Sequence, residues 1–247
     1  MNLLAFDTGT EQLSVALRSG PLPDGRLWQA EEPGGAQASA RLIPLIQSLM
    51  DQAGLRFSGL QAIVFGRGPG SFTGLRTACS VAQGLAWGAD VPVLPVDSLL
   101  ALAEEARHRH APAAARWRVL AVLDARMGEL YAGRYQWRDG SWSTEVPPGL
   151  CTPQQAATLL DGPVRLAGNA FATEEPWWPG AAEPPLAALP TAAALLRLAP
   201  ALLAEGAAVP PEQAMPLYLR DQVALTTAQR EALRPAPVPR AGAAGSP

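Results

Sequence analysis

Two stretches of the chain share one pattern, and this repeat limits the fold more than any other feature. Residues 3–17 read LLAFDTGTEQLSVAL and residues 120–135 read LAVLDARMGELYAGRY. Each has an apolar strand, an aspartate, a tight tip and a second strand. A third strand, a helix, a strand and another helix follow in both halves. Two βββαβα halves predict a duplicated α/β fold with two lobes.

The expected elements follow from the period of the apolar residues and from the capping residues. In the first half we expect strands at 2–6, 13–17, 26–30, 62–65 and 91–96, and helices at 37–53, 73–87 and 98–109. In the second half we expect strands at 119–123, 130–135, 142–146 and 164–167, and helices at 153–160 and 191–205. The helix at 37–53 is apolar nearly all round, which indicates burial on more than one side.

Residues 61–88, QAIVFGRGPGSFTGLRTACSVAQGLAWG, combine a strand, a glycine-rich loop and a helix. Ser71 or Thr73 is the expected N-cap, and Gly88 is the expected end of the helix. This arrangement presents backbone N–H groups to an anion, so the loop is a candidate phosphate site. Known phosphate fingerprints do not fit, because the chain has no lysine and the dinucleotide pattern needs a glycine where Ser71 stands. A loop that only packs is the alternative.

Composition and charge narrow the class of function. The 247 residues are 48% hydrophobic and carry a net charge of −3, so no overall positive field attracts nucleic acid. The apolar start of the chain stops at Asp7 with no basic segment before it, and prolines and an arginine interrupt the Ala/Leu-rich stretch 186–209. We therefore expect no signal peptide, no membrane span and a cytoplasmic protein.

Metal and nucleophile chemistry lack the residues that they need. The two histidines, His108 and His110, are two positions apart at an expected helix end and point in different directions. The two cysteines, Cys79 and Cys151, stand in no metal-binding spacing, and Cys79 is expected to pack as a small apolar residue. A serine nucleophile also lacks a plausible histidine partner, because both histidines lie in one expected exposed segment. We expect neither a metal nor a cofactor.

A duplicated fold with an acidic, Thr/Gly-containing hairpin tip resembles the superfamily of actin, sugar kinases and heat-shock ATPases (ASKHA). In that superfamily the tip holds phosphates and the two lobes clamp a nucleotide. The second glycine loop of this chain has shrunk to Gly168-Asn169, which indicates a degenerate second lobe. Two hypotheses result: a degenerate member that supports another protein, or a small-molecule kinase or other nucleotide-binding protein. The resemblance implies these phosphate-facing residues: Asp7, Thr8, Gly9, Thr10, Gly68, Gly70, Ser71 and Arg76.

Five motifs in one order are similar to those of the bacterial TsaB (YeaZ) family. They are DTGTEQLSVAL at 7–17, ARLIPLI at 40–46, GPGSFTGLR at 68–76, LDARMGELYAG at 123–133 and PLYLRDQVA at 216–224. The resemblance covers residues 1 to about 225. One departure is Gly9, where family members often have serine.

The resemblance implies a role in making threonylcarbamoyladenosine beside the tRNA anticodon. In this family TsaB is the non-catalytic partner of its paralogue TsaD, which transfers the threonylcarbamoyl group, and a small ATPase, TsaE, joins them. The paralogue carries a His-x-x-x-His metal pair on the helix that matches residues 37–53, and this chain has no histidine there. The resemblance therefore implies a chain that is not an enzyme itself and that meets tRNA through the complex.

The resemblance also implies the lobes and the partner surface. We expect residues 1–101 with about 213–225 in the N-terminal lobe, 102–212 in the C-terminal lobe and 226–247 as a disordered tail. The helices at 37–53 and 73–87 are expected to pack on the matching pair of the paralogue, or of a second copy when the chain is alone. The chosen interface residues are Leu42, Leu45, Ile46, Leu49, Ala78, Ala82 and Leu85.

Overall fold

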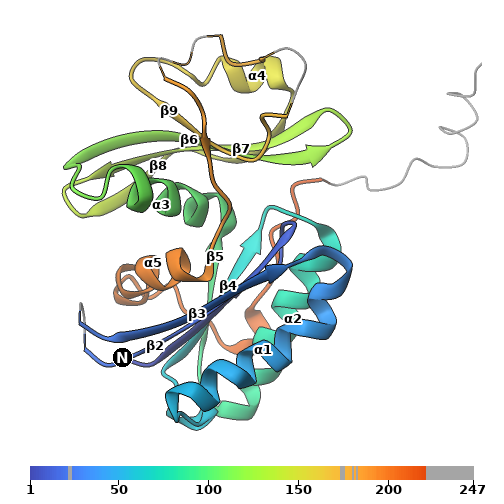
Figure 1. The fold of residues 1–247 in the computed structure, drawn as a ribbon, viewed down its shortest axis with the longest axis vertical. Helices are drawn as coiled ribbons and strands as arrows, with labels where there is room; N and C mark the ends of the chain where they lie inside the picture. The colour runs from blue at the N-terminus through green and yellow to red at the C-terminus, as the bar shows by residue number, and fades with distance from the viewer. Residues whose placement is uncertain (22–23, 173–175, 180, 182, 221–247) are drawn as a thin grey trace, which may run out of the picture.

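The computed structural model describes residues 1–21, 24–172, 176–179, 181 and 183–220 of the chain. Two five-stranded sheets form the cores of two lobes (Figure 1). The first sheet has the order β3-β2-β1-β4-β5 and the second the order β10-β9-β6-β7-β8. In each sheet three antiparallel strands are followed by parallel strands beside the first of the three. This shared order confirms the predicted duplicated α/β fold.

The elements have the following bounds. The first sheet contains β1 (Leu3–Asp7), β2 (Gln12–Ser19), β3 (Arg26–Pro33), β4 (Ala62–Gly68) and β5 (Val93–Asp97). The second contains β6 (Arg116–Arg126), β7 (Glu129–Arg138), β8 (Ser141–Cys151), β9 (Arg165–Gly168) and β10 (Leu186–Ala187). The α-helices are α1 (Ala38–Ala53), α2 (Phe72–Ala89), α3 (Ser98–His110), α4 (Pro153–Ala157) and α5 (Ala192–Ala204).

Several predicted boundaries were wrong, for local reasons. Helix α2 passes through Gly88 and ends at Ala89, and its C-cap Asp90 has a φ of 56°, the left-handed conformation that aspartate tolerates. Ser71 is the N-cap of α2, but its side chain makes no capping hydrogen bond. Strand β8 extends to Cys151 through two prolines, which is compatible with its position at the edge of the sheet.

Helices α1 and α2 lie side by side on one face of the first sheet (Figure 1). Their inward side chains, among them Leu42, Ile46, Ala78 and Ala82, form one core with β1, β2 and β4. Cys79 is buried in this core, as predicted. This face of the sheet is therefore covered within the chain, and the outer sides of the two helices remain on the surface.

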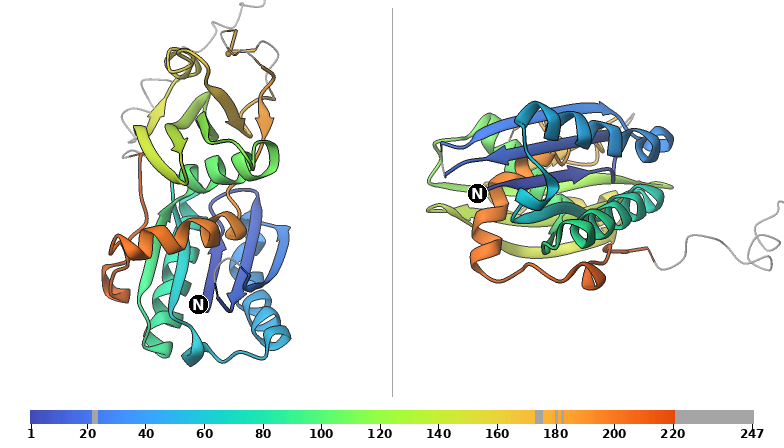
Figure 2. Two further views of the ribbon diagram at one scale, coloured as in Figure 1. Left: turned by 90° about the vertical axis from the view of Figure 1, so that its left-hand side faces the viewer. Right: turned by 90° about the horizontal axis from the view of Figure 1, so that it is seen from below.

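Helices α3 and α5 lie between the two sheets, stacked one above the other (Figure 2). Helix α3 packs on the second sheet, whereas α5, which comes from the second half of the sequence, packs on β1, β2 and β4 of the first. Arg197 of α5 pairs with Glu104 at 2.9 Å and with Glu105, and both glutamates are buried. The lobes are thus joined by an apolar contact with ion pairs inside it.

The segment after α5 returns along the first lobe. Val209 forms an antiparallel bridge with Val93, and the N–H of Leu217 donates to the carbonyl of Arg67 at 2.7 Å. Ala214 is buried against α2, where its carbonyl accepts from the thiol of Cys79. The segment carrying PLYLR therefore contacts β4 and α2 of the first lobe.

The predicted tail at 226–247 lies outside the described residues. Among the described helices, none combines the length and the apolar character that crossing a bilayer requires.

Candidate functional site

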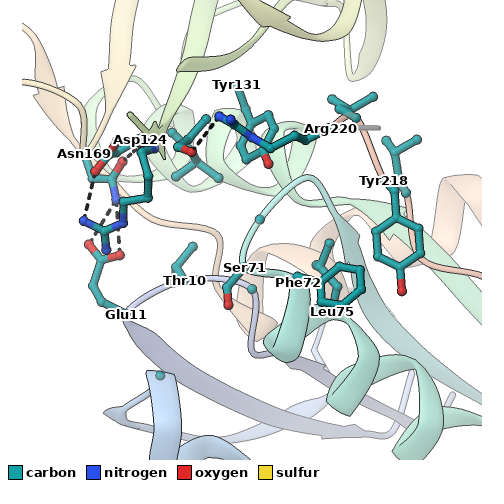
Figure 3. Close-up of a pocket in the computed structure, with 18 of the residues that line it drawn as sticks. Thr10, Glu11, Ser71, Phe72, Leu75, Asp124, Tyr131, Asn169, Tyr218 and Arg220 are labelled. Atoms are coloured by element: carbon teal, nitrogen blue, oxygen red, sulfur yellow. Dashed lines mark hydrogen bonds and ion pairs between the residues drawn. The ribbon is translucent and has the colours of Figure 1, made fainter. Parts of the chain in front are cut away.

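A cavity of about 460 Å³ lies between the two lobes, where the two hairpin tips face each other (Figure 3). The loop before α2 and the returning C-terminal segment complete its walls. Its walls combine aliphatic and aromatic side chains with a few polar ones. The lining includes Gly9, Thr10, Glu11, Gly70, Ser71, Phe72, Leu75, Asp124, Arg126, Met127, Tyr131, Asn169, Tyr218 and Arg220.

Asp7, the acid of the first hairpin, does not line this cavity. Its side chain is buried, with Oδ1 accepting from the N–H of Gly9 at 2.8 Å and Oδ2 accepting from the hydroxyl of Ser98 at 2.8 Å. Burial raises the pKa of this carboxyl, and the two hydrogen bonds oppose that rise. Both carboxyl oxygens therefore have partners inside the protein.

The other candidate phosphate residues divide into two groups. Gly9, Thr10, Gly70 and Ser71 line the cavity. Thr8 is buried and donates to the carbonyl of Gly74 at 2.6 Å, while Gly68 lies against Leu75 and the carbonyl of Leu217. Arg76 stacks on Phe72 at the surface. The structure thus brings together four of the eight residues at the cavity, and their contact with a phosphate stays a prediction.

The glycines of the loop allow the first hairpin to approach it closely. A Cβ at Gly66 would lie 1.7 Å from Oδ2 of Asp7, and a Cβ at Gly74 would lie 1.9 Å from the carbonyl oxygen of Thr8. A Cβ at Gly70 would lie 2.5 Å from the carbonyl oxygen of Gly9. Only glycine fits at these positions, so the glycine pattern is accounted for by packing of the hairpin on the loop.

The second lobe contributes the opposite wall. Asn169 accepts from the N–H of Asp124 at 2.9 Å and donates to Glu11 of the first lobe at 3.0 Å. The β6–β7 tip places Arg126 and Met127 in the left-handed region, with φ of 67° and 58°. The shrunken loop Gly168-Asn169 thus contacts the first lobe across one end of the cavity (Figure 3).

Sequence reasoning missed most of the aromatic and basic lining. Phe72 and Tyr218 come from segments 146 positions apart, and their rings lie 5.2 Å apart between centroids. Arg220 donates to the carbonyl of Ala125 and pairs with Glu129 at 2.6 Å, which ties the returning segment to the second lobe. Only the resemblance in PLYLRDQVA pointed to this segment, because nothing local in it indicates a cavity wall.

The chosen interface residues lie mostly in the core of the chain. Of the seven, the structure buries these: Leu42, Ile46, Leu49, Ala78 and Ala82. Leu45 and Leu85 are partly buried and pack against the same core. The apolar stripe of each helix therefore faces its own sheet, which corrects the choice of these side chains. The exposed large apolar side chains of the two helices are Ile43, Phe72 and Trp87.

The histidines lie where the sequence predicted, at the exposed end of α3. Within the described ranges, no three His, Cys, Asp or Glu side chains gather in a way that could hold a metal ion.

Comparisons with known proteins agree with the motifs. The family model of TsaD, tRNA N6-adenosine threonylcarbamoyltransferase, matches residues 33–175. The tRNA threonylcarbamoyladenosine biosynthesis protein TsaB of Escherichia coli is 35% identical over 91% of this chain and 96% of its own length. The protein of the same name from Haemophilus influenzae is 34% identical over 90% of this chain and 95% of its own.

A solved structure extends the likeness to the fold. YeaZ from Pseudomonas aeruginosa is 38% identical, covers 88% of this chain and 99% of its own, and has a TM-score of 0.75. The chain belongs to the TsaB (YeaZ) family and has a duplicated, two-lobed α/β fold.

Proposed function

We propose that this chain is a non-catalytic subunit required for threonylcarbamoyladenosine modification of tRNA, paired with the TsaD paralogue. The names of the full-length relatives supply the pathway. The observation that carries the non-catalytic part is the position of Asp7, whose carboxyl group is buried outside the cavity lining and accepts from Gly9 and Ser98. The TsaE ATPase joins the pair, and tRNA is bound by the assembly.

The outer sides of α1 and α2 support a helix-pair interface. On α2 the exposed positions Ser80, Gly84 and Gly88 repeat every fourth residue and form a strip of small side chains, and Trp87, 68% exposed, lies beside it. On α1 Ile43 is 43% exposed. A strip of small residues lets another helix approach closely, and an exposed tryptophan is typical of an interface anchor. The paralogue or a second copy of this chain would pack there, giving a four-helix contact.

Gly84→Arg tests this interface. A Cβ at Gly84 meets nothing within 4 Å, so the monomer accommodates the new side chain while a partner helix cannot approach. We expect the variant to fold, to lose co-purification with the TsaD paralogue and to lose tRNA modification in the reconstituted system. Gly149→Arg, also open within 4 Å but on β8 of the second lobe, is the matched control and should retain both. Equal behaviour of the two variants would place the interface elsewhere.

Asp7→Asn tests the non-catalytic role. The variant keeps the size of the side chain and removes its charge. In the reconstituted system we expect the variant to support tRNA modification at a rate within about twofold of wild type, because a side chain that takes no part in the reaction has little effect on its rate. A loss of several orders of magnitude with complex formation intact would mean that Asp7 takes part in the chemistry.

The alternative function is nucleotide binding, and the interlobe cavity is the observation that favours it. Gly9, Thr10 and Ser71 reach the cavity from the position where the superfamily holds phosphates. If ATP binds there, its presence at a hundred times its Kd would stabilise the isolated chain by about 2.7 kcal/mol, which a thermal scan detects. Thr10→Val should remove that shift. An unchanged midpoint with millimolar ATP would leave the subunit role as the better account.

A further inference from the structure

We propose that the mouth of the interlobe cavity is a contact site for single-stranded RNA, at which one unstacked nucleobase lies on a layer formed by Phe72, Arg76 and Tyr218. The proposal rests on the proposed function, because it assigns to this chain a direct contact with the RNA substrate of the assembly.

The layer is defined by three side chains at the first turns of α2 and in the returning segment. The guanidinium carbon of Arg76 lies 3.8 Å from the ring centroid of Phe72, and its Nε donates to the hydroxyl of Tyr218 at 3.1 Å. The two rings are 39% and 40% exposed. A guanidinium this close to a ring centroid forms a cation–π pair, and the exposed parts of the two rings remain accessible to a further ring.

Arg76 is the cation near this mouth that a ligand phosphate would meet. Arg126 and Arg220 line the cavity but pair with Asp124 and Glu129, whereas Arg76 lies over the ring of Phe72. Among the described residues no carboxylate forms an ion pair with Arg76. A phosphate beside the stacked base would therefore have a cation available.

The β6–β7 tip forms the opposite edge of the cavity. The N–H of Arg126 donates to Oδ1 of Asp124 at 2.7 Å, and the Arg126 guanidinium pairs with the same carboxylate. Met127 is 81% exposed, and its sulfur accepts from Arg220 at 3.5 Å. The tip therefore places an exposed thioether at the cavity edge, opposite the aromatic rings.

The exposed rings favour RNA as the ligand. Proteins bind unpaired RNA bases by stacking them on aromatic rings or on arginine planes, with phosphates held by nearby cations. Phe72 and Tyr218, tilted by 38° to each other and partly exposed beside Arg76, offer a base such a surface. An acidic peptide would also use aromatic rings and an arginine, so competition by a polyglutamate peptide separates the two ligands.

The test is fluorescence anisotropy with a labelled, unstructured RNA of about ten nucleotides and the full-length chain. We expect binding that weakens as salt is raised and that a blunt RNA duplex of the same sequence competes for poorly. Phe72→Leu should weaken binding about tenfold. Arg76→Lys, which keeps the charge and loses the plane, should also weaken it. Arg41→Ala, an exposed arginine on α1, is the matched control and should bind as wild type.

Ultraviolet cross-linking gives a second readout. The labelled RNA should cross-link to a peptide that contains Tyr218 or Phe72, as mapped by mass spectrometry. Circular dichroism checks that each variant is folded, and co-purification checks that each still binds the TsaD paralogue, so that failure of this inference is distinguished from failure of the proposed function.

Four results would each overturn the inference. One is the absence of RNA binding by wild type at low salt. Another is equal affinity of Phe72→Leu and Arg41→Ala. The other two are loss of the paralogue in the Phe72 and Arg76 variants and competition by a polyglutamate peptide as strong as that by RNA, either of which would assign the layer to a protein partner.

Discussion

Asn169 joins the two lobes by donating from Nδ2 to both carboxylate oxygens of Glu11, at 3.0 and 3.2 Å. These residues are 158 positions apart in the sequence. The same side chain accepts from the N–H of Asp124 through Oδ1 at 2.9 Å. One asparagine therefore holds the second hairpin tip with its oxygen and the first with its amide group, and it closes one end of the cavity.

We expect Asn169→Ala to lower the free energy of unfolding by about 1–2 kcal/mol, because both the Asp124 N–H and the Glu11 carboxylate lose a partner. Glu11→Gln keeps an acceptor oxygen and should cost less than about 0.5 kcal/mol. Urea denaturation of both variants and of the double variant gives the coupling between the two sites. Additive losses would show that the contact across the lobes contributes no stability.

The fold was predictable where the signal is local. Alternation in LSVAL and the apolar run before Asp7 identify the β1–β2 hairpin, and its likeness to the stretch around Asp124 identifies the duplication. The choice of sheet covered by α5 was not predictable. The Ala/Leu-rich surface of α5 fits either lobe. Arg197 holds α5 on α3 by pairing with Glu104 and Glu105. These residues are more than ninety positions apart, so no local pattern predicts the pairs.

The site was less predictable, because a periodic pattern shows that a helix has an apolar stripe without showing what covers it. The stripe through Leu42, Ile46 and Leu49 is the side that α1 packs on its own sheet, so it identifies the helix, but its side chains are buried within the chain. The outer strip on α2 is made of Ser80, Gly84 and Gly88, which carry little hydrophobic signal. The aromatic layer depends on Tyr218, which only the three-dimensional return of the chain brings to Phe72.

The hydroxyl of Tyr135 gives a prediction about stability. This side chain is fully buried on β7, and its oxygen has no hydrogen-bond partner among the described residues. Burial is the main cause that raises the pKa of the phenol. We expect Tyr135→Phe to raise the free energy of unfolding by up to about 1 kcal/mol, since an unpaired polar group is removed. Tyr218→Phe, which removes a bonded and exposed hydroxyl, should give no gain. A loss of stability in Tyr135→Phe would reveal a bound water at the hydroxyl.

The pKa of Asp7 predicts how stability depends on pH. Burial raises this pKa in the folded state above its ordinary value of 3.8, so the folded chain retains the proton to higher pH than the unfolded chain. The contribution of this group to stability is complete below about pH 4 and is lost as pH rises through the folded pKa. We expect the stability of wild type relative to Asp7→Asn to fall as the pH rises above about 4. A difference that stays constant with pH would contradict the raised pKa.

Gly66 on β4 and Gly84 in α2 differ in the space around them, which predicts opposite effects of a new side chain on stability. At Gly66 a new Cβ would collide with Asp7 at 1.7 Å, and Asp7 cannot move without losing the bonds from Gly9 and Ser98. At Gly84, in the middle of α2, a new Cβ meets nothing within 4 Å. We therefore expect Gly66→Ala to lower the free energy of unfolding by about 3 kcal/mol or more. Gly84→Ala should raise it by about 0.5–1 kcal/mol, because alanine loses less backbone entropy in a helix. Thermal and urea unfolding of the two variants measures both. Similar stabilities would mean that the hairpin can move away from the loop. Asp7, on whose buried position the non-catalytic proposal depends, would then not be held rigidly by Gly9 and Ser98.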